Sequence, residues 1–173
     1  MEFQRLCNQS KGIRFLLQRE IEIISLQNTI NHFKSNINVC NISDYLFEYW
    51  QKLLIFDDST EFFKLCPVPI IIVSNIDTDD LMHAISYNNL NPYGIVTSEE
   101  AKSYKPDKKI FDYTLKKYNL NENDVIHIGD SVSSDIIGAE NAGINAIWIN
   151  RKNKTIPDIV NKQIIKLTDI LND

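Results

Sequence analysis

Cysteine, glycine and proline are all scarce in this chain, and no apolar stretch reaches the length of a membrane span. The three cysteines, Cys7, Cys40 and Cys66, lie far apart and form no CxxC pair, so the sequence indicates neither a disulfide framework nor a zinc site. Such cysteine use is typical of a reducing cytosol. The N-terminus "MEFQRLCNQSKG" also has no hydrophobic signal core. We therefore expect a cytoplasmic protein with no membrane partner.

Runs of lysine or arginine are missing as well. The formal net charge of the chain is −5, which argues against a nucleic-acid surface as the main function. With 173 residues, of which 43% are hydrophobic and 24% charged, the chain has the composition of a packed globular protein. Small anions would then have to be captured by local groups.

The first third of the chain has a helical pattern. It contains one glycine, Gly12, and no proline before Pro67, and apolar residues recur at helical spacing over residues 15–33. We expect a helical hairpin there, followed by a third helix with Ser43 or Asp44 as its N-cap.

A further helix is expected at "FDDSTEFF", where Asp58 and Glu61 have the spacing of a capping box. The pattern changes at Pro69, because "IIIVSN" is a continuous β-branched run of the kind that is buried on both faces of a sheet. Strands and helices then alternate as in βαβ units. We expect helices at 79–87, 106–118 and 132–142, strands at 93–97, 125–128 and 146–149, and finally a short strand at 164–165 and a terminal helix.

The expected fold class is therefore α/β: a helical segment over residues 1–56, then a doubly wound parallel sheet over residues 57–173. Ligands bind such sheets at the carboxyl ends of the strands. Small polar or acidic residues stand at three of these ends: Ser74, Asn75, Thr97, Ser98, Gly129, Asp130 and Ser131.

The stretch "IHIGDSVSSD" carries two acids just after a strand. Gly129 permits tight backbone geometry beside a ligand, and Asp130 offers a hard oxygen donor suited to magnesium, with Asp135 about one helical turn further on. A strand-to-helix turn with an aspartate N-cap would give the same tripeptide. His127 lies inside the strand, and we expect it to be a hydrogen-bonded core histidine and not a catalytic base.

Two other positions offer groups for a phosphate. Ser74 ends its strand with a hydroxyl followed by free backbone amides, although a helix cap would explain it equally simply. Lys105 precedes Pro106, which fixes the start of the next helix, so its ammonium group would be held as a point charge for phosphate. The alternative is an ordinary solvated lysine.

Taken together, "IIIVSN", "SYKPDKKIF" and "IHIGDSVSSDIIGAENAGINAIWINR" resemble motifs II, III and IV of the haloacid dehalogenase (HAD) superfamily of hydrolases, in family order. The resembling subgroup carries a helical cap inserted early in the chain, so residues 1–56 would be a partial cap. The style of motif IV is similar to that of phosphatases acting on small phosphorylated metabolites, nucleotides among them.

The resemblance implies a role for each matching residue. In such enzymes a strand-end aspartate attacks phosphorus, a second aspartate two residues later acts as general acid and base, and Mg²⁺ neutralises the phosphoryl group. Ser74 and Asn75 would bind the phosphoryl group, and Lys105 would stabilise the nucleophile and the developing charge. Asp130 would coordinate Mg²⁺, and Asp135 would support the metal directly or through water.

Motif I of the family, an apolar strand followed by Asp-x-Asp, should precede the cap and is not found there. Asp57 and Asp58 in "LLIFDDST" are adjacent and lie after the helical region, where they suit a helix start. "IRFLLQRE" places Gln18 and Glu20 where the two aspartates should be, and its continuation has a helical pattern.

We therefore expect this chain to be inert alone, with its first strand missing from the centre of the sheet. A separate N-terminal segment could supply the strand, the two flanking strands could close up, or a second copy could fill the gap by exchange. The alternative functions are a non-catalytic remnant that binds phosphate, Mg²⁺ or a partner chain, and an unrelated flavodoxin-like module.

Overall fold

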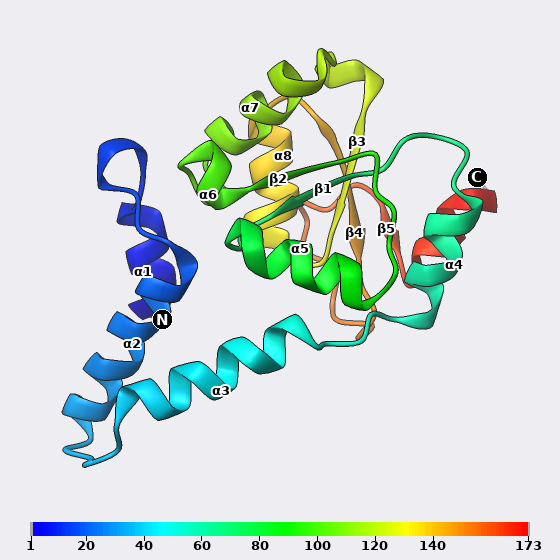
Figure 1. Ribbon diagram of the computed structural model, residues 1–173. Coiled ribbons are helices and arrows are strands. Elements are labelled where there is room, and N and C mark those ends of the chain that lie inside the picture. The colour runs from blue at the N-terminus through cyan, green and yellow to red at the C-terminus, as the bar shows by residue number, and fades with distance from the viewer. Residues whose placement is uncertain (1, 173) are drawn as a thin grey trace. The chain divides into compact units, whose positions relative to one another are not determined.

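The computed structural model describes residues 2–172, which divide into two compact units (Figure 1). The first unit comprises residues 2–54, 74–90 and 97–104, and the second comprises residues 55–73, 91–96 and 105–172. The α/β fold class is confirmed, because helices alternate with short parallel strands along the second half of the chain. Among the described residues, no helix combines the length and apolar character that crossing a membrane requires.

The N-terminal helices of the first unit are α1 (Glu2–Gln9), α2 (Gln18–His32) and α3 (Val39–Gln51). The helices of the expected hairpin are α1 and α2, which pack against each other, although residues 15–33 hold only α2. The predicted N-cap of the third helix is wrong: α3 begins after Asn38, whose side chain accepts a hydrogen bond from Cys40 N at 2.9 Å. Asn38 was missed because Ser43 and Asp44 offer the same capping chemistry one turn later.

Two later segments complete the first unit with α5 (Thr78–Tyr87) and α6 (Ser98–Ala101). The Arg19 guanidinium donates to both carboxylate oxygens of Asp80, at 2.7 and 2.5 Å, and Gln51 donates to the same carboxylate at 2.8 Å. The Tyr104 hydroxyl donates to Leu16 O at 2.9 Å. Segments far apart in sequence are thus joined by polar contacts. The same unit contains a buried apolar cluster formed by Cys7, Ile21 and Tyr104.

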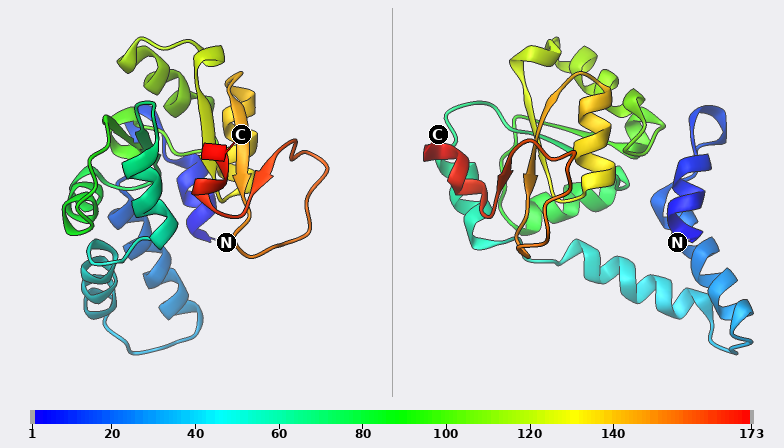
Figure 2. Two further views of the ribbon diagram at one scale, coloured as in Figure 1. Left: turned by 90° about the vertical axis from the view of Figure 1, so that its right-hand side faces the viewer. Right: turned by 180° about the vertical axis from the view of Figure 1, so that it is seen from behind.

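The second unit holds two sheets. Strand β1 (Ile71–Ser74) pairs with β2 (Gly94–Thr97), and β3 (Ile126–Gly129), β4 (Asn145–Ile149) and β5 (Gln163–Ile164) form a parallel three-stranded sheet. Helix α8 (Ile137–Asn141) and the C-terminal 3₁₀ helix η4 (Leu167–Asn172) lie on opposite faces of this sheet, as Figures 1 and 2 show. Helix α7 (Lys108–Tyr118) packs against α8, and α4 (Asp57–Leu65) packs against η4.

The expectation that β1 is buried on both faces is wrong. All four of its residues are only partly buried, whereas Ala146, Ile147, Trp148 and Ile149 of β4 are buried. The difference follows from pairing, because β4 has a strand on each side and β1 has only β2. Nor do β1 and β3 close up into one sheet: they remain edge strands of two sheets.

The helix expected at "FDDSTEFF" is confirmed as α4, but the predicted capping box is not formed. The Asp58 carboxylate instead accepts hydrogen bonds from Arg151 Nη1 and Leu167 N, both at 2.7 Å. The Arg151 guanidinium also lies 4.1 Å from the ring centroid of Phe56. Asp58 therefore ties α4 to the end of β4 and to the start of η4, partners that lie about a hundred residues away in sequence.

We predict that Asp80→Ala lowers the free energy of unfolding by about 2 kcal/mol, because it removes three hydrogen bonds to a carboxylate, two of them from a guanidinium. Urea denaturation measures the change. Asp79→Ala is the matched control, since Asp79 is exposed on the same turn of α5. Equal losses in the two variants would show that the Arg19 contact contributes nothing measurable.

Candidate strand-end site

The candidate site of the second unit is built on the turn that follows β3. Gly129 is required there by close approach: a Cβ at this position would lie 2.2 Å from Asp135 Cγ. The chain then enters a short π-helical turn, Val132–Ile136, before α8 begins. Such turns are frequent at functional sites. This one places the Asp135 side chain directly over the backbone of Gly129.

Asp135 is the centre of the site, and only 4% of its surface is exposed. Its Oδ1 atom lies 2.5 Å from Lys105 Nζ and 3.2 Å from His127 Nε2, and its Oδ2 atom accepts a hydrogen bond from Ser131 N at 2.9 Å. Burial raises the pKa of this carboxyl. The hydrogen bond from His127, the charge of and hydrogen bond from Lys105, and the Ser131 amide outweigh that effect and hold the pKa well below its usual range. Asp135 is therefore ionised at neutral pH.

Lys105 is not a solvated surface lysine, because only 9% of its surface is exposed. Besides the ion pair with Asp135, its ammonium group donates to Val73 O at 3.0 Å. Val73 is the residue before Ser74 in β1. The backbone of Pro106 lies close to Gly138 of α8, at 3.0 Å from an ideal Cβ, so the start of this segment is tightly packed. Lys105 thus has a fixed position between a strand carbonyl and a buried carboxylate.

His127 is hydrogen-bonded, as expected, and its ring packs edge-on against Phe111 with centroids 5.2 Å apart. Its partner is the Asp135 carboxylate and not a substrate-facing group. His127 was predicted to lie in the strand, but its contact with Asp135 was not predicted. The local sequence pattern does not show which side chains meet when they are eight residues apart.

Asp130 is the exposed carboxylate of the site. Its backbone carbonyl accepts a hydrogen bond from Trp148 Nε1 at 3.0 Å. Within residues 2–172, no group of three or more His, Cys, Asp or Glu side chains could by itself enclose a metal ion. Mg²⁺ does not need such a cage, because it keeps several waters and binds through one or two carboxylates together with phosphate oxygens. Asp130 fits this mode as a direct ligand, and Asp135, with both oxygens already accepting hydrogen bonds, fits a supporting role.

Ser74 and Asn75 belong to the first unit, at the end of β1. The loop after them is held by its neighbours: Ser98 Oγ donates to Ile76 O at 3.3 Å, and Thr78 N donates to the Glu99 carboxylate at 2.8 Å. These contacts fix the backbone just beyond the serine. Ser98 was predicted to lie at a strand end, but its hydrogen bond to this loop was not predicted.

Asp77 is a residue that the sequence analysis did not single out. Its carboxylate accepts hydrogen bonds from Gln18 N at 2.7 Å and Arg19 N at 3.0 Å. Burial, the largest effect, raises the pKa of Asp77, although these two amides oppose the rise. Asp77 thus holds the first turn of α2. Because this helix already begins at Gln18, "IRFLLQRE" does not form the strand that a degenerate motif I would need.

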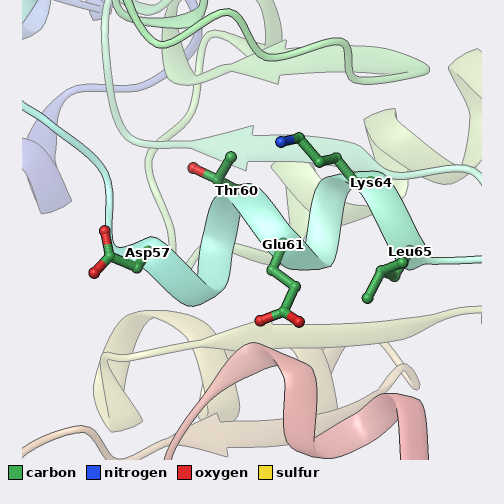
Figure 3. A pocket seen from close by; sticks show the side chains of 5 residues that line it. All are labelled: Asp57, Thr60, Glu61, Lys64 and Leu65. Carbon is green, nitrogen blue, oxygen red and sulfur yellow. The ribbon is translucent and has the colours of Figure 1, made fainter.

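A separate depression of about 460 Å³ lies on α4 (Figure 3). It is lined by one face of this helix: Asp57, Thr60, Glu61, Lys64 and Leu65. None of the predicted site residues lines it, so it is not part of the strand-end site.

We predict that Asp135→Asn lowers the free energy of unfolding by about 3 kcal/mol at pH 7, because it leaves the Lys105 ammonium buried without its counter-charge. The folded-state pKa of Asp135 is depressed, so its contribution is present above the ordinary aspartate pKa of about 4 and is lost as the pH falls below it. The difference between the two proteins should therefore shrink at pH 3.

Urea denaturation at pH 7 and pH 3, in buffer with a chelator, measures this difference. Asp112→Asn is a suitable control, because Asp112 pairs with Lys108 on the exposed surface of α7. A difference of the same size at both pH values would contradict an ionised Asp135.

Comparison with known proteins identifies the family of this chain. Residues 51–149, more than half of the chain, match the family model of haloacid dehalogenase-like hydrolases. The pyrimidine 5'-nucleotidase YjjG of Escherichia coli (strain K12) is 42% identical over 65 residues, which are 37% of this chain and 29% of the nucleotidase. The haloacid dehalogenase-like hydrolase domain-containing protein 3 of Danio rerio is 30% identical over 131 residues, 72% of this chain and 52% of that protein.

The chain thus spans about half or less of the length of these relatives. Among solved structures, the magnesium-bound HAD-hydrolase YfnB of Bacillus subtilis has a TM-score of 0.80 at 20% identity, covering 99% of this chain and 78% of YfnB. Because the family model matches more than half of the chain, the chain belongs to the haloacid dehalogenase-like hydrolases.

Proposed function

We propose that this chain is part of a Mg²⁺-dependent phosphatase that hydrolyses small phosphorylated metabolites in the cytoplasm through an aspartyl-phosphate. The observation that carries the proposal is the position of Lys105: a buried ammonium group bound to Asp135 at 2.5 Å and to the carbonyl of Val73 at 3.0 Å. A lysine held this firmly serves as a fixed positive charge for a phosphoryl group.

Each residue of the proposed site has one task. Lys105 stabilises negative charge on the nucleophile and the phosphoryl group, the Ser74 hydroxyl donates to a phosphoryl oxygen, and Asn75 orients that group. Asp130 provides the carboxylate for Mg²⁺, and Asp135 keeps Lys105 in place. Mg²⁺, when bound, would neutralise phosphoryl charge and favour in-line attack. A relative that is named a pyrimidine 5'-nucleotidase supports phosphate esters, nucleotides among them, as the substrate class.

In this proposal the nucleophile comes from outside residues 1–173. We propose that a further segment, or a second copy by strand exchange, adds an apolar strand that ends in Asp-x-Asp. The unpaired edges of β1 and β3 support this, because each belongs to a different sheet and neither is covered by a strand on its free side within the described chain. The half-buried state of β1, an unbroken β-branched run, supports it as well.

Turnover of p-nitrophenyl phosphate with Mg²⁺ tests the proposal. We predict that the chain of residues 1–173 shows no turnover, and that an N-terminal extension supplying an apolar strand and Asp-x-Asp restores it. In the extended protein, Lys105→Met and Asp130→Asn should each lower kcat about a hundredfold or more, as the loss of one charge-stabilising group does.

Lys108→Met is the matched control, because Lys108 is exposed three residues further on and pairs with Asp112 on the surface of α7. It should leave kcat unchanged. Turnover by the unextended chain that Asp130→Asn abolishes would place the nucleophile within residues 1–173 and contradict the proposal. No turnover by the extended protein, although it folds, would favour a non-catalytic member of the family.

A further inference from the structure

The peptide group between Asp130 and Ser131 is held from both sides. Its carbonyl oxygen, that of Asp130, accepts a hydrogen bond from Trp148 Nε1 at 3.0 Å. Its N–H, that of Ser131, donates to Asp135 Oδ2 at 2.9 Å. Because both bonds belong to one rigid plane, the plane cannot rotate without breaking at least one of them.

Trp148 is itself buried in the sheet. It lies on β4 with 4% of its surface exposed, directly opposite Gly129 in the parallel register. On its other side its backbone N–H donates to Lys162 O at 3.0 Å, in the segment that leads into β5. The indole therefore extends from the middle strand of the sheet, and its N–H reaches across to the residue after β3.

The hydrogen-bond acceptor on the other side of this peptide plane, the Asp135 carboxylate, is equally fixed. Asp135 is bound by Lys105 and His127 through its other oxygen, so the carboxylate that receives the Ser131 N–H does not turn freely. The plane before Asp130 is fixed too, because Gly129 is paired with Trp148 in the sheet. With both neighbouring planes held, the direction in which the Asp130 side chain leaves the backbone is determined.

We infer that Trp148 is a positioning residue for the metal-binding carboxylate: its indole N–H orients the Asp130–Ser131 peptide and thereby the Asp130 side chain. This rests on the proposed function, in which Asp130 binds Mg²⁺. Groups of this kind, which orient a ligand without touching the metal, change metal affinity about tenfold to a hundredfold when they are removed. The sequence itself contains no sign of the contact, since Trp148 is one apolar residue in an apolar strand.

The test uses amide NMR of the whole chain, with MgCl₂ in the presence of inorganic phosphate as the probe. Trp148→Phe removes the N–H and part of the ring, and Trp50→Phe is the matched control, because Trp50 is the only other tryptophan and packs against Phe47 on α3 in the first unit. Replacing Trp148 with benzothienylalanine keeps the two-ring shape and exchanges only the N–H for sulfur, so it separates the hydrogen bond from packing.

Two quantities are measured in each protein. The first is the Mg²⁺ dissociation constant, from the shifts of the Asp130 and Ser131 amides; we expect it to rise about tenfold in both Trp148 variants and to stay unchanged in Trp50→Phe. The second is hydrogen exchange of the Ser131 amide without metal, relative to Ile147 of β4; we expect it to quicken about fivefold when the indole bond is lost.

The outcomes separate this inference from the proposed function. Wild-type affinity for Mg²⁺ in the benzothienylalanine protein, or unchanged Ser131 exchange, would overturn the positioning role and leave Asp130 as a metal ligand. If neither the wild-type chain nor Trp50→Phe shows a saturable Mg²⁺ shift that Asp130→Asn removes, the metal site of the proposed function fails and the positioning role fails with it.

Discussion

The arrangement of the strand-end loops in the second unit depends on the buried charge of Asp135. A carboxylate without partners would be neutralised in such a place, since the loss of water raises its pKa. Here Lys105, His127 and the Ser131 amide supply donors to both oxygens, and they come from three separate parts of the chain. The ionised form is therefore stable only when the segment before α7, strand β3 and the π-helical turn are all in place. The ionisation of Asp135 thus depends on the correct packing of all three segments.

The first unit uses the same chemistry for a different purpose. Asp77 and Asp80 accept hydrogen bonds from the N-terminal helices, Asp77 from two backbone amides of α2 and Asp80 from the side chains of Arg19 and Gln51. For Asp80, burial raises the pKa, but the hydrogen bonds from Arg19 and Gln51 and the charge of Arg19 outweigh it, and the pKa is lowered. In both units, then, buried acids in the segments after the strands hold elements together. Of the acids Asp77, Asp80, Asp130 and Asp135, Asp130 is the exposed one.

Much of this arrangement could be predicted from the sequence, and the failures have a common cause. The β-branched runs and the turn residues such as Gly129 predicted the alternation of helices and strands, because these signals are local. The contact between Lys105 and Asp135 was not predicted. Asp58 was expected to cap its own helix, yet it binds Arg151 and the backbone of Leu167. Asp77 and Trp148 were missed for the same reason: their partners are fixed by packing across the fold, which residue spacing does not encode. The burial of β1 was overestimated because it depends on how many strands flank it.

The path of the chain through its two units determines whether the protein can be cut into independently folding fragments. The first unit is not a continuous stretch, since residues 74–90 and 97–104 return to it after the second unit has begun. A fragment ending near residue 56 would carry α2 and α3 without the acids that hold their ends, leaving Arg19 and Gln51 without Asp80 and the first amides of α2 without Asp77. The remaining fragment would keep Asp77 and Asp80, which are buried in the whole chain, but would lack the groups of α2 and α3 that donate hydrogen bonds to them. Neither piece is a natural module, and limited proteolysis in the α3–α4 connection would yield two fragments that stay associated.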